Sequence, residues 1–194
     1  MPTILDKHKK TLRGFALFSL TILLPLQASA IAYCAIREPV ETIQQFFPDF
    51  TSYKTLDGTI SETLRISVQQ KLTKKTFNEE GRHNLYVVFG SDSVEGFVHA
   101  RTEKGIYGLD EIIWSIHPDL SIKGFEYQRK RGTPMNPVQL ERYNALVSGQ
   151  TADSLEKLLS DENKLTALEI NLVESALKAL LVTQGIWGRE ISEL

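Results

Sequence analysis

Two short stretches of the chain carry side chains that suit the binding of a phosphate group. The first is Ser148-Gly149-Gln150-Thr151, in which a glycine lies between two hydroxyl-bearing residues. Glycine lets the backbone approach a phosphate closely, and a helix that starts after Thr151 would offer N–H groups and the positive end of its dipole. The same string also fits a plain connection between two helices, with Gly149 ending one and Thr151 or Asp153 capping the next. Both interpretations are open at this point.

The second stretch is the basic run Arg129-Lys130-Arg131, which precedes Thr133-Pro134. Arginine binds phosphate oxygens through charge-assisted hydrogen bonds, so Arg129 and Arg131 are candidate phosphate contacts. The alternative is a solvated end of a strand. Aromatic side chains could stack on a flat ring, although such residues more often pack in a core. The candidates are Tyr107, Trp114, Tyr127 and Trp187.

The remaining polar residues predict neither a metal site nor a hydrolytic centre. His83, His99 and His117 are isolated in the sequence and do not show the close spacing of converging metal ligands. The single cysteine, Cys34, cannot form a disulfide within the chain or a thiolate cluster. Ser148 lacks the strand-to-helix elbow that positions a hydrolase serine.

Length and charge fit one globular domain that does not bind nucleic acid. The chain has 194 residues, of which 42% are hydrophobic and 24% charged. Residues 1–30 hold four of the 22 basic residues and one of the 24 acidic ones, so the remainder carries a net charge of −5. A mildly acidic body argues against binding to nucleic acid.

Residues 1–35 have the order of a secretory signal peptide. A basic cluster, Lys7–Arg13, precedes the apolar run Gly14–Leu26, and Ala28-Ser29-Ala30 then supplies a small-residue cleavage pattern. The competing interpretation is an uncut membrane anchor, because no charged residue occurs in the 23 residues from Gly14 to Ile36. Both interpretations place residues 36–194 outside the cytoplasm, since the basic flank stays inside.

Two further interpretations of the same segment have less support. Cys34 suggests a lipoprotein signal, but the bulky Tyr33 precedes it where that signal requires a small residue. A buried core helix conflicts with the basic cluster that directly abuts the apolar run. Pro25 and Gln27 weaken the anchor interpretation without removing it.

Residues 36–194 predict an α+β domain. A short helix is expected from Pro39 to Phe47, a strand at Thr51–Leu56, a turn at Asp57-Gly58, and a helix capped by Ser61. Four strands with short turns then predict an antiparallel meander. These strands are Leu85–Phe89, Val94–Thr102, Glu111–His117 and Ser121–Arg129.

The C-terminal third has helical periodicity. Helices are expected at Val138–Val147, after Thr151 or Asp153, and at Leu168–Gln184. Helices at both ends of the four-stranded meander are predicted to pack on one face of the sheet.

The meander resembles the FMN-binding domain family, which occurs in the flavin-carrying subunits of the sodium-pumping NADH:quinone oxidoreductase and of the Rnf electron-transfer complex. The stretch Trp114–Phe125 (WSIHPDLSIKGF) is similar to the family's V-x-I-D-P-D-G-K-I-x-G-V strand. Thr133-Pro134 then falls at the spacing of the family's E-T-P-G. The similarity covers residues 83–134, with a weaker likeness in the flanking helices.

The chain departs from the family pattern at several positions. Gly132 and Met135 replace the glutamate and the glycine of E-T-P-G. The family esterifies its flavin to a threonine in an S-G-A-T-x-T-S motif, at a place where this chain has Leu168–Ser175 (LEINLVES). The nearest string is Ser148–Ser154, which lies closer to Pro134 than the family motif does.

The resemblance implies an extracytoplasmic FMN-binding domain that takes part in electron transfer within a membrane or envelope redox complex. Such a domain would be an electron carrier or accessory subunit rather than a stand-alone enzyme. The altered motifs support a second hypothesis, a binding or scaffold module that kept the fold and carries no flavin. The implied flavin contacts are Arg129, Arg131, Thr133, Pro134, Ser148, Gly149 and Thr151, with Thr151 as the position for covalent attachment.

Overall fold

The structure is a computed structural model that describes residues 35–73, 79, 81–105, 107–161 and 164–194. The predicted N-terminal signal or anchor, residues 1–35, lies outside these residues except for Ala35. Among the helices of the described part, none is long and apolar enough to cross a membrane.

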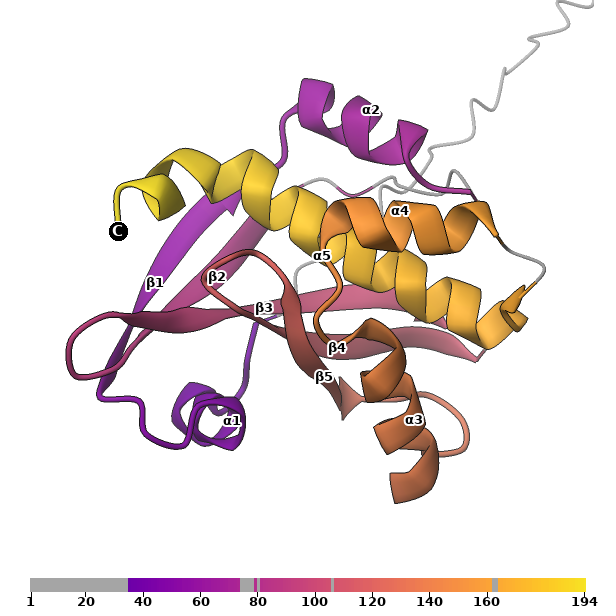
Figure 1. The fold of residues 1–194 in the computed structure, drawn as a ribbon, viewed down its shortest axis with the longest axis horizontal. Coiled ribbons are helices and arrows are strands. Elements are labelled where there is room, and N and C mark those ends of the chain that lie inside the picture. Colours follow the sequence, from indigo (N-terminus) through magenta and orange to yellow (C-terminus); the bar gives the residue numbers. More distant parts are fainter. Residues whose placement is uncertain (1–34, 74–78, 80, 106, 162–163) are drawn as a thin grey trace, which may run out of the picture.

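A single antiparallel sheet forms the centre of the molecule, and its strands follow one another in chain order (Figure 1). The predicted α+β class is therefore confirmed. The strands are β1 (Ser52–Thr59), β2 (Arg82–Phe89), β3 (Val94–Gly105), β4 (Gly108–Ile116) and β5 (Ile122–Arg129).

The sheet has five strands rather than the predicted four, because the first strand joins the meander. β1 pairs with β2 along its whole length, from Ser52 opposite Phe89 to Thr59 opposite Arg82. The predicted turn at Asp57-Gly58 is wrong, since both residues lie within β1. Pairing with β2 overrides their local turn preference. Glycine suits position 58 because a Cβ atom there would lie 2.1 Å from the side chain of Ile186.

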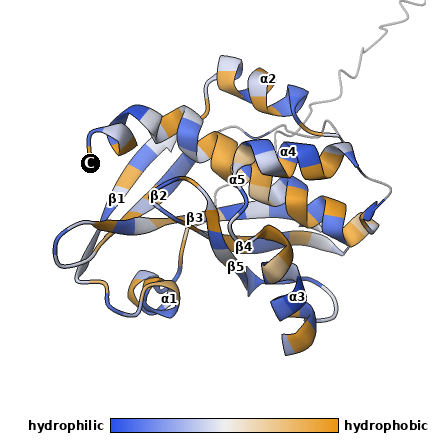
Figure 2. Cartoon of the chain, viewed as in Figure 1, coloured by the Kyte–Doolittle hydropathy of each residue, from blue (hydrophilic) through white to orange (hydrophobic). Residues whose placement is uncertain are grey.

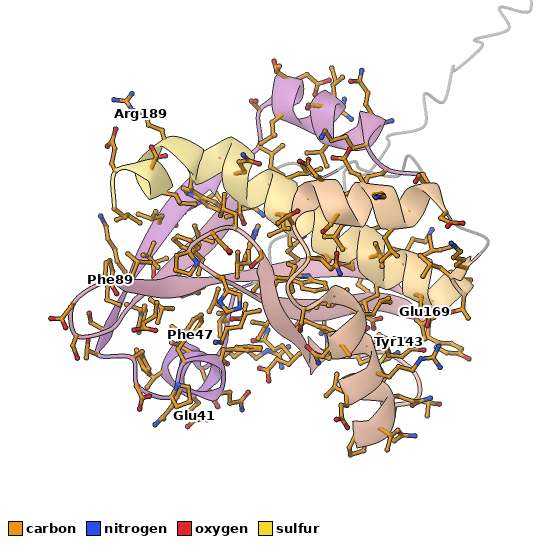
Figure 3. The ribbon with its side chains drawn as sticks, viewed as in Figure 1. Glu41, Phe47, Phe89, Tyr143, Glu169 and Arg189 are labelled. Atoms are coloured by element: carbon orange, nitrogen blue, oxygen red, sulfur yellow. The ribbon has the colours of Figure 1, made fainter. Side chains whose placement is uncertain are left out.

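Helices cover both faces of the sheet, so the prediction that they pack on one face is wrong. The long helix α5 lies across one face, and α2 and α4 pack beside it (Figure 1). Helix α1 covers the other face with Ile43 and Phe47 (Figures 1 and 3). The helices are α1 (Pro39–Phe46), α2 (Glu62–Gln70), α3 (Pro137–Val147), α4 (Ala152–Ser160) and α5 (Ala167–Ser192).

The alternation of side chains along the central strands explains the two covered faces. On β2, Leu85 and Val87 face α5, while Tyr86 and Val88 face α1. All four side chains are buried, so β2 is apolar on both faces of the sheet, and each face has to be covered by other elements. Hydrophobic residues also dominate the central part of α5 (Figure 2).

The Asn144 side chain hydrogen-bonds α3 to the edge strand β5, and we expect its replacement to lower the stability of the domain. The side-chain oxygen accepts from the backbone N–H of Phe125 at 2.8 Å, and the amide nitrogen donates to the Phe125 carbonyl at 3.2 Å. Asn144→Leu should lower the free energy of unfolding by about 1–3 kcal/mol, because both backbone groups lose this partner. Chemical denaturation measures the change, with exposed Glu141→Ala on the same helix as the control. Equal stability of the two variants would contradict this role.

Candidate functional site

The predicted flavin contacts lie at opposite ends of β5. Arg129 is the last residue of the strand, and Arg131 and Thr133-Pro134 follow it. The string Ser148–Thr151 lies against the first residue, because Gly149 N–H donates to the Ile122 carbonyl at 2.7 Å. Eight strand residues separate the two groups by about 23 Å. One phosphate therefore cannot contact both groups.

The string Ser148–Thr151 forms a connection between α3 and α4. The Ser148 hydroxyl donates to the Lys123 carbonyl at 3.1 Å, and Gly149 has a φ of 74°, in the left-handed region that favours glycine. Thr151 and Ser154 form a capping box, in which the Ser154 hydroxyl accepts from Thr151 N–H at 2.8 Å. The helix–turn–helix interpretation therefore describes the geometry of this string.

The stretch Leu168–Ser175, where the family has its flavin-binding threonine, lies inside α5. The N-terminus of this helix holds a carboxylate of its own chain. Glu169 Oε2 accepts from the backbone N–H and the hydroxyl of Thr166, each at 2.8 Å. Glu169 Oε1 accepts from Arg142 Nη2 at 2.6 Å, where α3 meets α5 (Figure 3).

Hydrogen bonds from Thr166 and from Arg142 lower the pKa of Glu169, which keeps its side chain ionised. This carboxylate takes the place beside the helix dipole that an external phosphate would need. Thr166 is thus a second threonine whose hydroxyl serves as a helix cap.

At the C-terminal end of β5, Arg129 is held in an ion pair, whereas Lys130 and Arg131 form none with another described residue. Arg129 Nη2 lies 2.5 Å from Glu111 Oε1, and Glu111 also binds Arg37 at 2.8 Å. The Arg131 backbone N–H donates to Asp110 Oδ1 at 2.6 Å, but no ion pair with another described residue holds its guanidinium or the ammonium of Lys130. The Lys130 ammonium lies over the Tyr127 ring, 5.5 Å from its centroid, so the exposed Arg131 is the cation better placed to meet a ligand or a surface.

The four candidate aromatic rings differ sharply in exposure. Trp114 on β4 and Trp187 on α5 are fully buried in the core, and Tyr127 is half-buried against Phe125. The Tyr107 side chain is 71% exposed. Its ring packs on Gly132, where a Cβ atom would lie 2.3 Å from the ring. Of these four aromatic residues, Tyr107 is therefore best placed to meet a partner from solvent.

A buried ionic cluster that the sequence analysis does not predict lies between the sheet and α5. Arg101 on β3 is 1% exposed, and its Nη2 donates to both oxygens of Glu79 at 2.6 and 2.5 Å. Its Nε donates to Glu103 Oε1 at 3.1 Å, and Lys178 on α5 binds the other oxygen of Glu103. Two cations and two carboxylates therefore balance one another inside the protein.

The charges of this cluster act on one another. Burial raises the pKa of Glu79, and Arg101 opposes that rise. Burial also disfavours ionised Glu103, but Lys178 and Arg101 outweigh it and lower the pKa of Glu103. The two carboxylates raise the pKa of Arg101 despite its complete burial. The ionised states of Arg101 and Glu103 therefore depend on their partners.

His83 and His99, which looked isolated in the sequence, lie side by side next to this cluster. Their ring centroids are 5.7 Å apart, and the Trp187 ring lies 5.5 Å from His99. Burial, together with the charge of Arg101, lowers the pKa of His83 to about 3 and holds that of His99 well below its usual value. Both imidazoles are therefore neutral at physiological pH.

One signal in the sequence could have located the cluster. His99, Arg101 and Glu103 alternate along a strand whose other face carries Val98 and Ala100. Alternate residues share a face, so this pattern places three polar side chains together on an interior face. The partners Glu79 and Lys178 come from distant parts of the chain and could not be paired by inspection.

The described part of the chain holds no group of three or more side chains that could ligate a metal. Comparisons of the chain with known family models, with curated proteins and with solved structures gave no match.

Proposed function

We propose that this chain is a flavin-free binding module of a membrane or envelope complex, with its body on the extracytoplasmic side. The observation that carries the proposal is that Thr151, the predicted attachment position, and Thr166, the threonine just before Leu168–Ser175, both serve as helix caps. The hydroxyls of Thr151 and Thr166 cap α4 and α5. An ester bond to FMN at either hydroxyl would remove its O–H and leave a weaker, crowded acceptor in the capping box.

Two further observations support a module without FMN. The predicted phosphate contacts are split between the two ends of β5, and Glu169 already neutralises the N-terminal end of α5. The extracytoplasmic location rests on the basic cluster Lys7–Arg13 and the uncharged run that follows it. The fold can be kept while the cofactor is lost, because function resides in the site and not in the fold.

The variant Thr151→Ala separates a helix cap from a flavin attachment site. We expect a loss of about 1 kcal/mol in the free energy of unfolding, because the α4 N-terminus loses its cap. Thr151→Ser should keep most of the stability, since serine also caps. The mass of the intact chain, produced together with a flavin transferase, should show no FMN adduct in wild type or in either variant. An adduct in wild type that is absent from Thr151→Ala would refute the flavin-free proposal.

Noncovalent FMN at the arginine end of β5 is the second candidate, and it would make the chain an electron-transfer protein. The observation in its favour is the exposed Tyr107 ring, which packs on Gly132 next to Arg131 in the chain, with Thr133 and Pro134 exposed in the same loop. The ring would stack on the isoalloxazine and the cation would bind the phosphate. We rank it second because small-ligand sites are usually concave, whereas these residues lie on the surface.

FMN titration tests this second candidate directly. Arg129→Gln combined with Arg131→Gln should weaken FMN binding about tenfold or more, since hydrogen bonds to a charged group contribute about 1.5–3 kcal/mol. Arg189→Gln, at an exposed position on α5, is the matched control. Binding that is unchanged in the double variant would remove this site, and no binding to wild type would remove the candidate.

A further inference from the structure

One corner of the domain combines exposed apolar side chains with basic side chains that form no ion pair with another described residue. The Tyr107, Leu109 and Val138 side chains are 71%, 48% and 75% exposed. Three basic residues accompany them in sequence or across the sheet. We call this set the basic tip, and it consists of Lys104, Tyr107, Leu109, Lys130, Arg131 and Val138.

The β3–β4 hairpin and the loop after β5 bring the basic tip together. Lys104 and Leu109 are directly opposed across β3 and β4, so they share a sheet face. The Tyr107 ring packs on Gly132, and Arg131 Cγ lies 3.6 Å from the place of a Cβ atom on Gly108. Val138 is the second residue of α3, the helix that follows the same loop.

The N-terminal segment joins the domain beside this tip. Gln128 Nε2 donates to the Ala35 carbonyl at 3.1 Å, and Arg37 N–H donates to Gln128 Oε1 at 2.9 Å. Arg37 also pairs with Glu111, which lies two residues from Leu109 on the same face of β4. That spacing corresponds to about 7 Å along the strand. The uncharged run that ends at Ile36 therefore reaches the domain next to the tip.

We infer that the basic tip faces the membrane and contacts anionic phospholipid headgroups around the N-terminal segment. This inference rests on the proposed function, in which the chain belongs to a membrane or envelope complex. It takes residues 14–36 as an uncut membrane anchor. Tyrosine and aliphatic side chains favour the membrane–water interface, and lysine and arginine are attracted to anionic headgroups. The body carries a net charge of −5, so a local excess of cations fixes which side turns toward an anionic surface.

Depth-dependent quenching in lipid vesicles tests the inference on the full chain. In a Cys34→Ser background, Val138→Cys or Ser91→Cys receives an environment-sensitive fluorophore. Ser91 is an exposed control in the β2–β3 turn, at the far end of the 12-residue strand β3 from the tip. The labelled chain is reconstituted in vesicles of phosphatidylcholine alone or mixed with phosphatidylglycerol, each with and without brominated lipid.

We expect brominated lipid to quench the label at position 138 at least twofold more than the label at position 91. The difference should be larger in the vesicles with phosphatidylglycerol. Lys130→Gln combined with Arg131→Gln should remove that increase and leave the fold intact, because both side chains lie outside the core. Equal quenching at the two positions would overturn the inference. A chain that remains in the supernatant, or a label at 138 shielded by a copurified protein rather than by lipid, would also overturn it.

The flavin content of the same samples separates this inference from the proposed function. A chain with bound FMN and a quenched label at 138 would refute the flavin-free proposal and leave the membrane contact in place. A colourless chain with equal quenching at both positions would refute the membrane contact alone.

Discussion

Replacing Arg101 by methionine should lower the free energy of unfolding by about 3–5 kcal/mol, one of the two largest effects that we expect from a single substitution. The Arg101 side chain is completely buried, and it compensates Glu79 and Glu103. Methionine fills much of the volume but leaves the Glu79 carboxylate inside the protein without its main partner. This loss is a large share of the free energy of unfolding of an ordinary domain, which is about 5–15 kcal/mol.

Chemical denaturation of the variants and two controls measures this effect. Arg189→Met removes an exposed arginine that pairs with Glu193 one helical turn away, and it should change stability by less than about 0.5 kcal/mol. Arg101→Met combined with Glu79→Gln should be more stable than Arg101→Met alone, because the buried negative charge is also removed. A loss below about 1 kcal/mol for Arg101→Met would show that the buried cluster does not stabilise the fold.

The free energy of unfolding should fall as the pH is lowered from about 6.5 to about 3, and the titration of His83 should cause part of that fall. The pKa of His83 is lowered from 6.5 to about 3 in the folded protein. Between these values the unfolded chain binds a proton that the folded protein does not, so stability falls as the pH falls. The expected slope is about 1.4 kcal/mol per pH unit for His83. His99, whose pKa is also lowered, adds to it.

The variant His83→Gln isolates this contribution because glutamine does not titrate. Its stability should depend on pH less steeply than that of wild type by about 1.4 kcal/mol per pH unit below pH 6.5. Val87→Ala, which shortens a buried side chain on the same face of β2, is the matched control. It should lower stability at every pH without changing the slope. Equal slopes for wild type and His83→Gln would mean that His83 is protonated in the folded protein.

Local patterns were sufficient to predict most elements of the fold. The apolar run Leu85–Phe89 lies within β2, and the strand predicted at Glu111–His117 coincides with β4 as far as Ile116. Ser61 caps a helix as expected, and Thr151 is the cap of α4. The turn predicted at Asp57-Gly58 is wrong, because local turn preference does not decide the conformation there. Pairing with β2 and the close approach of Ile186 decide that position, and neither is visible in a single stretch of sequence.

The candidate site was harder to predict than the fold, because it depends on contacts between distant residues. The arrangement of α3 along β5 separates Arg131 from Thr151, although the two lie only 20 residues apart in the chain. The ionic cluster joins Glu79, Arg101 and Lys178 from three separate elements or loops. Only the alternation along β3 gave a local sign of it.

The measurement that most directly tests the central claim is the flavin content of the chain, produced in a host with and without a flavin transferase. A visible spectrum of the native protein and flavin fluorescence on a denaturing gel are recorded from the same preparation. The flavin-free proposal predicts a colourless, folded protein and a dark gel band in both hosts, and no uptake of added FMN. A yellow native protein with a dark band would favour noncovalent FMN near Tyr107 and Arg131. Fluorescence that survives denaturation would contradict the proposal, because it would demonstrate covalent FMN.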